Sequence, residues 1–462
     1  MIIERPKPSA AKPSLAQLID KYDGRAPRYT SYPTAVQFTP AVDAATYAAW
    51  LKALPAGDPV SLYLHIPFCA RLCWYCGCNT RAVNRREPIS DYVKLLISEF
   101  GLVRDALSGP LAASAVHLGG GTPNMLSPDE IDAIFDSLAA IFPSTEGLEV
   151  AAELDPAVLT RDWVQAAARR GLNRASLGVQ SLSPHVQQAV NRTDTIAQIT
   201  DGVAWLREAG VRSINLDLMY GLPNQTVDDT LATLDQVLRL RPERLALFGY
   251  AHVPWMKTHQ KLIREAELPG AHERLDQSEA AAALLIEEGY VRIGLDHFAL
   301  EGDSLTRAMR QGTLHRNFQG YTTDAATTLI GMGASAIGEL PQGFVQNQSQ
   351  ELAWRAAVSQ GRLPVARGVA LTDDDRLRAE IIERLMCDLA VDLRAVSARH
   401  GRAAAELRPE LARLRDFADD GLVELDGYQV RAAERGRMLV RSVAAVFDTY
   451  FSASDGRHSK AI

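Results

Sequence analysis

Four of the five cysteines of this chain lie within ten residues, at Cys69, Cys73, Cys76 and Cys78. Thiolates this close together either converge on a soft metal centre or form disulfides. A disulfide framework is typical of short secreted chains that are rich in cysteine. This chain has 462 residues and only one further cysteine, so the pattern favours a metal centre.

The spacing of the cysteines separates two kinds of metal site. Structural zinc takes four ligands, usually from two separated Cys-x-x-Cys pairs. Here three cysteines follow the pattern Cys-x-x-x-Cys-x-x-Cys, and Cys78 comes after one more residue. Three thiolates in one loop suit a 4Fe–4S cluster that leaves one iron open for a substrate. A structural zinc site is the alternative.

The cysteine spacing, directly after the apolar run 61–66, resembles that of the radical S-adenosylmethionine (SAM) enzymes. The phrase Tyr63-Leu-His-Ile-Pro-Phe-Cys69 and the additional Cys78 resemble the oxygen-independent coproporphyrinogen III oxidases of haem synthesis. Matching phrases run from the N-terminal arm to the tail. The resemblance implies that Cys69, Cys73 and Cys76 hold the cluster and that Cys78 is not a ligand.

Glycines and polar residues follow several other apolar runs. The turn Gly119-Gly-Gly-Thr-Pro123 lets a ligand approach the backbone, although phosphate binding or a plain tight turn would also explain it. Asp217 lies inside an otherwise apolar run, where an unpaired carboxylate is costly. Arg192 or a ribose hydroxyl is its predicted partner. Acids after a strand can also cap a helix, and Asp155 is a better cap candidate than Glu153.

The resemblance further implies that two SAM molecules share one site. Beside the cluster, the matching residues for the first are Tyr63, Gly120 and Glu153, and for the second Tyr75, Gly121, Thr122, Gln180, Arg192, Asp217, Ala251 and Ile337. Coproporphyrinogen III carries four propionates, so cations must converge on it. The candidates are Arg28, Lys257, His315 and Arg316, each of which also fits an ordinary surface charge.

The implied reaction is the oxidative decarboxylation of coproporphyrinogen III to protoporphyrinogen IX. A 5′-deoxyadenosyl radical would take hydrogen from the β-carbon of a propionate, and an electron donor such as flavodoxin or ferredoxin would serve a monomeric enzyme. One alternative is a haem-binding, chaperone-like radical SAM relative, but such relatives lack Cys78 and the Arg28-Tyr-Thr-Ser-Tyr arm present here. Another is a methyltransferase, which the phrase Leu314-His-Arg-Asn-Phe-Gln-Gly320 disfavours.

The elements that must position these residues alternate between short apolar runs and amphipathic helical patterns. The runs lie at 61–66, 115–118, 148–154, 174–179, 213–218, 245–250 and 291–295, and the helical patterns at 89–107, 128–141, 196–209 and 227–240. This alternation predicts an α/β fold with βαβ units and a parallel sheet. Periodicity does not separate a barrel from a doubly wound sheet. The resemblance implies a partial, open β/α barrel, with functional loops at the C-terminal ends of its strands.

Three parts are predicted along the chain: an N-terminal arm at 1–55, a radical SAM barrel at 56–345 and a mostly helical domain at 346–462. Within the arm, residues 22–34 form an extended segment rich in tyrosine, arginine and proline. This segment is either a strap that packs its aromatic rings or a lid over an anionic substrate. The small residues of 331–338 predict a flexible stretch.

The C-terminal part combines a helical pattern at 373–393 with an Asp-Gly hairpin at 421–431, which resembles a winged-helix module. A formal charge of −7 argues against nucleic-acid or anionic-membrane binding, so the module is interpreted as a cover for the site. Cys387 is expected in the core. No signal-peptide h-region and no apolar run of membrane-spanning length occur, and clustered thiols then predict a cytoplasmic protein.

Overall fold

The computed structural model describes residues 13–22, 24 and 26–451. By their internal contacts they form two units. The larger is Thr30–Asp375, and the smaller joins the described residues up to Tyr29 with those from Arg376 onward. No helix among the described residues is both long and apolar enough to cross a lipid bilayer.

The larger unit is built on one mixed sheet of twelve strands. In spatial order they are β16 (Val365–Ala370), β15 (Gly343–Asn347), β14 (Ile337–Leu340), β13 (Leu329–Met332), β1 (Pro59–Ile66), β4 (Ala112–Gly120), β5 (Ser144–Leu154), β6 (Arg174–Gln180), β7 (Ser213–Tyr220), β8 (Arg244–Gly249), β10 (His297–Leu300) and β9 (Tyr290–Ile293). The strands from β13 to β8 run parallel. The two ends of this order do not pair, so the barrel is open, which confirms the predicted fold class.

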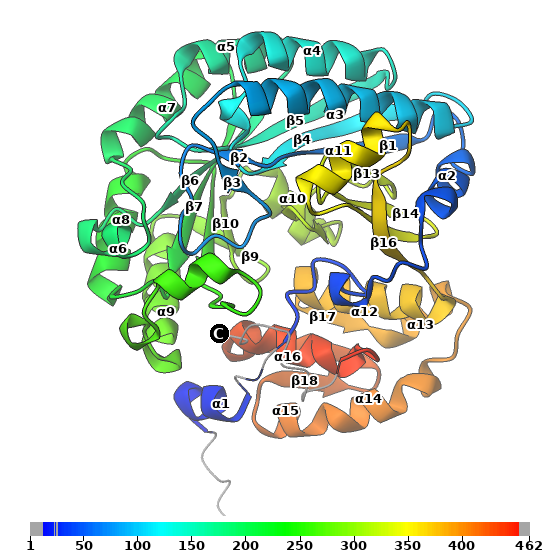
Figure 1. The fold of residues 1–462 in the computed structure, drawn as a ribbon. Coiled ribbons are helices and arrows are strands. Elements are labelled where there is room, and N and C mark those ends of the chain that lie inside the picture. The colour runs from blue at the N-terminus through cyan, green and yellow to red at the C-terminus, as the bar shows by residue number, and fades with distance from the viewer. Residues whose placement is uncertain (1–12, 23, 25, 452–462) are drawn as a thin grey trace, which may run out of the picture. The chain divides into compact units, whose positions relative to one another are not determined.

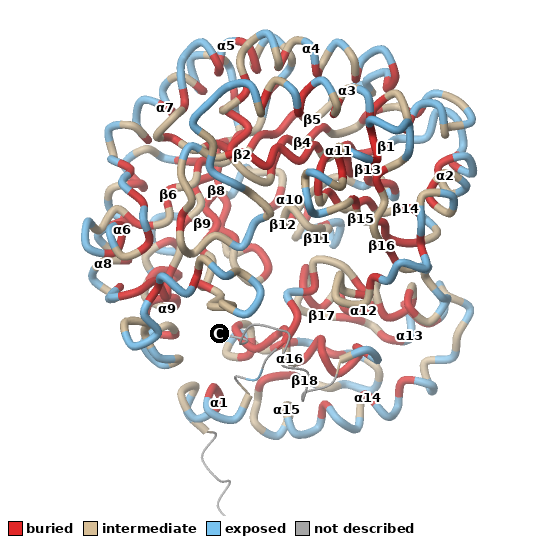
Figure 2. The backbone as a smooth tube through the Cα atoms, viewed as in Figure 1, coloured by how far each residue is buried: buried red, intermediate tan, exposed pale blue. Residues whose placement is uncertain are grey.

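Helices lie outside the parallel strands, as Figure 1 shows for α3 (Glu87–Ala106), α4 (Pro128–Ala139), α5 (Arg161–Arg169), α6 (Pro184–Ala189), α7 (Ile196–Glu208) and α8 (Val227–Leu238). The larger unit also contains α2 (Ala44–Lys52), α9 (Ala271–Glu287), α10 (Ser304–Gln311) and α11 (Glu351–Ser359). The four predicted helices correspond to α3, α4, α7 and α8. Capping boxes at Ser127, Thr195 and Thr226 begin the last three. The strands are buried, and the helices around them expose their outer faces (Figure 2).

Two predictions about the ends of this sheet are wrong. The run 291–295 is not another parallel strand, because a tight turn at Gly294 leads β9 straight into β10 as an antiparallel pair at the sheet edge. The stretch 331–338 is not a flexible connection, since it contributes residues to two strands. Its first residues belong to β13, which pairs with β1, and its last residues belong to β14, which pairs with β13. A Cβ atom on Gly331 would lie 2.4 Å from the carbonyl oxygen of Ile337. Glycine at position 331 therefore allows the backbones of β13 and β14 to pack closely.

The smaller unit contains most of α12 (Asp373–Asp388) and a three-stranded sheet. The sheet has the order β17 (Ala390–Asp392), β19 (Gln429–Ala432), β18 (Val423–Asp426). The other helices of this unit after α12 are α13 (Leu393–Arg399), α14 (Arg408–Arg413), α15 (Arg415–Asp419) and α16 (Val440–Ala444). The hairpin β18–β19 turns at Asp426-Gly427, as predicted. Cys387 is buried, which confirms its place in the core.

The predicted N-terminal arm is divided between the two units at Tyr29. Helix α1 (Leu15–Tyr22) belongs to the smaller unit, where the ring of Tyr22 stacks on Phe417 with 4.5 Å between centroids. The hydroxyl of Tyr29 donates to Asp448 at 3.1 Å, whereas Arg28 is exposed. Part of the extended segment thus packs within this unit. Residues 1–12, 23 and 25 lie outside the described residues, and the role of the arm as a lid stays a prediction.

Candidate functional site at the strand ends

The cysteines lie on a loop that leaves the C-terminal end of β1. This cysteine loop runs from β2 (Phe68–Cys69) to β3 (Arg81–Ala82), two short strands that pair in parallel and so close the loop on itself. Its four thiols are free; Cys73 is buried and Cys78 exposed. The residues predicted to hold a metal therefore lie at the end of the barrel where parallel strands deliver functional side chains.

Two of the predicted ligands have polar partners outside the cysteines. Cys69 Sγ lies 3.0 Å from Thr80 Oγ1, and the hydroxyl of Thr122 also bonds to it. Cys73 Sγ accepts from the Arg192 guanidinium at 3.6 Å. Hydroxyl and guanidinium donors favour the thiolate, which is the form that binds iron. At Cys69, however, burial outweighs the hydroxyl contacts and raises the pKa of the thiol.

Cys76 and Cys78 interact with each other. The thiol of Cys78 donates to Cys76, which lowers the pKa of Cys76 to about 7. The backbone N–H of Cys78 also lies 3.4 Å from Cys76 Sγ. Among the described residues, no three His, Cys, Asp or Glu side chains are arranged around a single ion. A four-iron cluster makes a different demand, because each thiolate binds its own iron.

The glycine turn 119–123 lies against the start of the cysteine loop. The N–H of Gly121 donates to the carbonyl oxygen of Ile66 at 2.9 Å. A Cβ atom on Gly121 would lie 2.6 Å from that oxygen, and one on Gly120 would lie 2.3 Å from the His65 ring. Both glycines are therefore required for packing, whatever they bind.

Tyr63 and Glu153 lie on neighbouring parts of the barrel interior, with a histidine between them. Glu153 accepts from the Gly120 N–H at 3.0 Å and lies 3.3 Å from His117 Nε2. Desolvation alone would raise the pKa of Glu153, but these partners hold it below its usual value. The Tyr63 hydroxyl lies 3.1 Å from His65 Nδ1, and its ring is 5.8 Å from that of His117. The three residues predicted for the first SAM are thus brought together.

All three nitrogens of the Arg192 guanidinium have polar partners. It forms an ion pair with Asp194 and lies 3.7 Å from Asp155 Oδ1. Its Nη1 donates to the Tyr75 hydroxyl at 3.0 Å, and its Nη2 donates to the carbonyl oxygen of Gly178. A guanidinium held by so many partners has one fixed orientation.

Asp217 lies on β7 with a different set of partners. It accepts from Ser176 Oγ and from Asn215 Nδ2, each at 2.7 Å. Burial raises the pKa of Asp217. The prediction that Arg192 is its partner is wrong, because Asp194 in the same loop takes that guanidinium. A ribose hydroxyl stays a predicted partner.

The remaining predicted SAM contacts occupy three further strand ends. Gln180 ends β6 in the left-handed region, at φ +66°. A Cβ atom on Gly178 would lie 3.0 Å from Gln180 Nε2 and 3.4 Å from Arg192 Nη2. The side chains of Gln180 and Arg192 therefore both pack against this glycine. Ala251 lies two residues after the end of β8, and Ile337 begins β14. The structure therefore places the predicted set on one end of the barrel.

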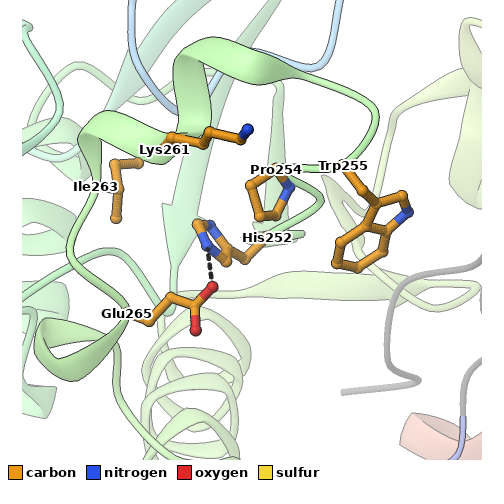
Figure 3. A pocket seen from close by; sticks show the side chains of 6 residues that line it. All are labelled: His252, Pro254, Trp255, Lys261, Ile263 and Glu265. Carbon is orange, nitrogen blue, oxygen red and sulfur yellow. Dashed lines mark ion pairs between the residues drawn. The ribbon is translucent and has the colours of Figure 1, made fainter.

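The segment after β8 contacts the cysteine loop and carries Lys257. The Lys257 ammonium donates to the carbonyl oxygen of Cys78 at 3.0 Å, and His259 Nε2 lies 2.7 Å from that of Cys76. A pocket of about 460 Å³ opens on this segment, lined by His252, Pro254, Trp255, Lys261, Ile263 and Glu265 (Figure 3). None of the predicted site residues lines this pocket.

Two other substrate candidates share a hairpin made by β11 (His315–Asn317) and β12 (Gly320–Thr322). Arg316 lies 3.7 Å from the Asp296 carboxylate, and its guanidinium is 4.5 Å from the centre of the Tyr321 ring. The pairing orients this cation inside the barrel unit. Arg28 belongs to the smaller unit, whereas Lys257, His315 and Arg316 belong to the larger one.

Sequence reasoning missed three charged or titratable residues of this site. Arg71 lies between the first two cysteines and pairs with Asp194, while His117 faces Glu153. The prediction for Asp155 as a helix cap is also wrong, since Thr160 caps α5 and Asp155 lies among the arginines. An acid two residues after Arg192 was the one available signal, and it became informative only with the fold.

Comparisons with known proteins agree over nearly the whole chain. Residues 63–237 match the radical SAM superfamily and residues 371–439 the HemN C-terminal domain. The oxygen-independent coproporphyrinogen III oxidase of Bradyrhizobium diazoefficiens is 48% identical, covering 95% of this chain and 97% of its own. Coproporphyrinogen III oxidase, anaerobic 1, of Cereibacter sphaeroides is 42% identical, covering 97% and 99%. Coproporphyrinogen III oxidase (HemN) from Escherichia coli, described as a radical SAM enzyme, superposes with a TM-score of 0.88 at 35% identity, covering 94% and 99%.

Proposed function

Since this chain belongs to the oxygen-independent coproporphyrinogen III oxidases of the radical SAM superfamily, we propose that it converts coproporphyrinogen III to protoporphyrinogen IX. The observation that carries the proposal is the loop of free cysteines at the end of β1, together with Arg192 on the neighbouring α6–α7 loop and Glu153 near the end of β5. When bound, a 4Fe–4S cluster and SAM supply a 5′-deoxyadenosyl radical that takes a β-hydrogen from a propionate. Each of two propionates would then lose carbon dioxide and one electron and become a vinyl group, and the electron would pass to a one-electron acceptor.

Cys69, Cys73 and Cys76 would hold the cluster. The donor set fits, because three sulfurs of one loop have polar partners: Cys73 accepts from a guanidinium, Cys76 accepts from a thiol, and Cys69 contacts two hydroxyls. Cys78 acts as the donor to Cys76, which supports a role as a neighbour of the cluster rather than a fourth ligand. Thr80 and Arg192 would orient the ligands, as hydrogen-bonding partners commonly do at metal sites.

We propose that the strand-end residues form two SAM sites. Tyr63, Gly120 and Glu153 would serve the first. Tyr75, Gly121, Thr122, Gln180, Arg192, Asp217, Ala251 and Ile337 would serve the second. Support comes from their positions on or after β1 and β4–β8 and at the start of β14, with Tyr75 in the cysteine loop and Arg192 in the loop between α6 and α7. The Arg192 guanidinium would face a carboxylate, and a two-pronged pair would form once its bonds to the Tyr75 hydroxyl and the Gly178 carbonyl are exchanged for it. Asp217 would bind a ribose hydroxyl, to which a carboxyl can either donate or accept.

The propionates would be bound by Arg28, Lys257, His315 and Arg316. Lys257 beside the cysteine loop and Arg316 inside the barrel unit support this for two of them. Arg28 would belong to a lid formed by the arm. Such a lid would exclude water and oxygen from the reacting groups.

The enzyme would work as a monomer in the cytoplasm and take electrons from a flavodoxin or a ferredoxin. Free thiols on the cysteine loop support a reducing compartment, because exposed cysteines such as Cys78 readily oxidise elsewhere.

The proposal is tested by an anaerobic assay of the reconstituted full chain with coproporphyrinogen III, SAM and dithionite. Protoporphyrinogen IX, methionine and carbon dioxide should appear together. Cys76→Ser should lose iron and product, whereas Cys78→Ser should keep its iron. Porphyrinogen that is bound but never decarboxylated by an iron-loaded protein would contradict the enzyme and favour a binding role.

A further inference from the structure

The cysteine loop is fastened to the loop between α6 and α7. The backbone N–H of Trp74 donates to the carbonyl oxygen of Val190 at 3.0 Å. The side-chain amide of Asn191 donates to the carbonyl oxygen of Leu72 at 2.9 Å. These are direct bonds to residues between the proposed cluster ligands, so the α6–α7 loop fixes where those ligands lie.

Asp194 stands at the centre of this contact and pairs with a cation from each side. Its side chain is fully buried and forms ion pairs with Arg71 of the cysteine loop and with Arg192 of its own loop. Its carbonyl oxygen accepts from Gln187 Nε2 at 2.8 Å, which fixes its backbone. Arg71 also donates to Thr193 at 2.9 Å. One carboxylate therefore joins two guanidinium groups from two loops.

The charges around Asp194 are balanced and cannot lose one member without a cost. Arg71 and Arg192 face two carboxylates, those of Asp194 and Asp155. The Oδ1 atom of Asp155 lies 3.9 Å from Arg71 Nη2 and 3.7 Å from Arg192 Nη2. Without the Asp194 carboxylate, two largely buried cations would share the more distant Asp155. Buried charges that lose a partner usually move or recruit another anion. The nearest sulfur is Cys73 Sγ, 3.6 Å from Arg192.

We propose that Asp194 is a positioning residue, which links the cysteine loop to Arg192 and so sets the guanidinium between Cys73 and the second SAM site. The part about SAM rests on the proposed function. Arg71, Asp194 and Arg192 form one chain of charges, and its far end contacts Cys73 and the Tyr75 hydroxyl. A displacement at Asp194 is therefore felt both at a cluster ligand and at the group that binds the SAM carboxylate.

The test is Asp194→Asn in the full-length protein, which keeps the side-chain shape and removes the charge. In the protein without cluster or SAM, amide hydrogen exchange of residues 69–78 should speed up at least about tenfold, since the loop loses its anchor. In the reconstituted Asp194→Asn protein, the cluster should keep its iron. The electron paramagnetic resonance spectrum of its reduced, SAM-treated form should differ from that of the wild type treated in the same way. The weaker of two SAM affinities in a titration should fall about tenfold.

Two further variants keep this test decisive. Arg71→Met breaks the same chain from the other loop without touching Arg192, so it should speed up exchange of residues 69–78 even where Asp194→Asn does not fold. Asp132→Asn removes a carboxylate that pairs with Arg170 at 2.5 Å on the outer helices and serves as the matched control. It should leave all three measurements unchanged.

The inference and the proposed function fail in different ways. Wild-type exchange, spectrum and SAM titration in both Asp194→Asn and Arg71→Met, with only a lower unfolding temperature, would overturn the positioning role. A wild-type protein that takes up neither iron nor SAM would contradict the proposed function, and with it the SAM part of the inference. Faster exchange in the protein without cluster would still support the link between the two loops.

Discussion

Glu153 and Asp217 are two acids that face the same barrel interior, and their partners differ. Glu153 accepts a backbone N–H at 3.0 Å and lies 3.3 Å from His117, a side chain that can carry positive charge. Asp217 accepts from two uncharged groups, Ser176 and Asn215. The pKa of Glu153 is held below its usual value, whereas burial raises that of Asp217.

The difference shows that burial alone does not decide the charge of an acid in this barrel. A backbone N–H and a histidine together favour the carboxylate strongly enough to offset desolvation, whereas a hydroxyl and an amide do not. The β5 side of the site therefore presents a carboxylate whose charged form is favoured, and the β7 side presents one whose charged form is disfavoured by burial. Charge-removing variants should separate the two sides.

Glu99 sharpens this comparison as a third acid, buried away from the site and bonded only to uncharged donors. It accepts from the Gly333 N–H, the Asn347 amide and the Trp354 indole, and burial raises its pKa to about 7. The folded protein then keeps a proton that the unfolded chain releases near 4.5. Stability should therefore fall as pH rises from about 4.5 to 7, by up to about 3 kcal/mol, and be flat above.

Urea unfolding followed by tryptophan fluorescence at several pH values measures this effect. Glu99→Gln cannot release a proton and should lose this fall between pH 5 and 7. Ser98, its exposed neighbour on α3, offers Ser98→Ala as a control that should keep the wild-type slope. Identical slopes in wild type and Glu99→Gln would mean that Glu99 is already ionised below pH 5.

Glu153→Gln should have the larger effect of the two site variants, because it removes a charge that is present at neutral pH. A lost charge-assisted hydrogen bond costs about 1.5–3 kcal/mol, or roughly ten- to a hundredfold in affinity. Isothermal titration of the anaerobic, reconstituted protein with SAM should show this loss in the first site. Unchanged affinity would remove Glu153 from the proposed SAM contacts.

Asp217→Asn should have the smallest effect, because burial already disfavours the charge that the variant removes. The carbonyl oxygen of the new side chain can still accept from Ser176, so we expect SAM affinity in the second site to change by less than about tenfold in the same titration. A hundredfold loss would show that the charge of Asp217 contributes to SAM binding, and the contrast with Glu153 would disappear.

The sequence was informative where the chemistry is local. Apolar runs mark β1 and β4–β8 because strands buried on both faces need continuous apolar residues. The cysteine loop and the strand-end residues were found because parallel strands present their C-terminal ends on one side. The pairing of Arg192 with Asp194 and Arg71 could not be read in this way, since it joins residues 71 and 194 through the fold alone.

The strand β13 shows the other limit. Leu329-Ile-Gly-Met332 is short and is followed by Gly333, so its composition suggested a loose connection. Its glycine at 331 permits an approach to β14 that any larger residue would block. Propensity scales describe side chains that fit a pleated surface and give no weight to such close backbone contacts. Only the neighbours of this strand make it a strand.

The position of β13 also affects how the protein is made. In the finished sheet β13 is the neighbour of β1 on the side away from β4, with Ser61 opposite Leu329. During synthesis, one edge of β1 must wait until residues 329–332 have left the ribosome. Unpaired strand edges invite pairing with other chains. A nascent chain that stalls before Leu329 should therefore be prone to aggregation or need a chaperone, although every residue that would hold the cluster has already been made.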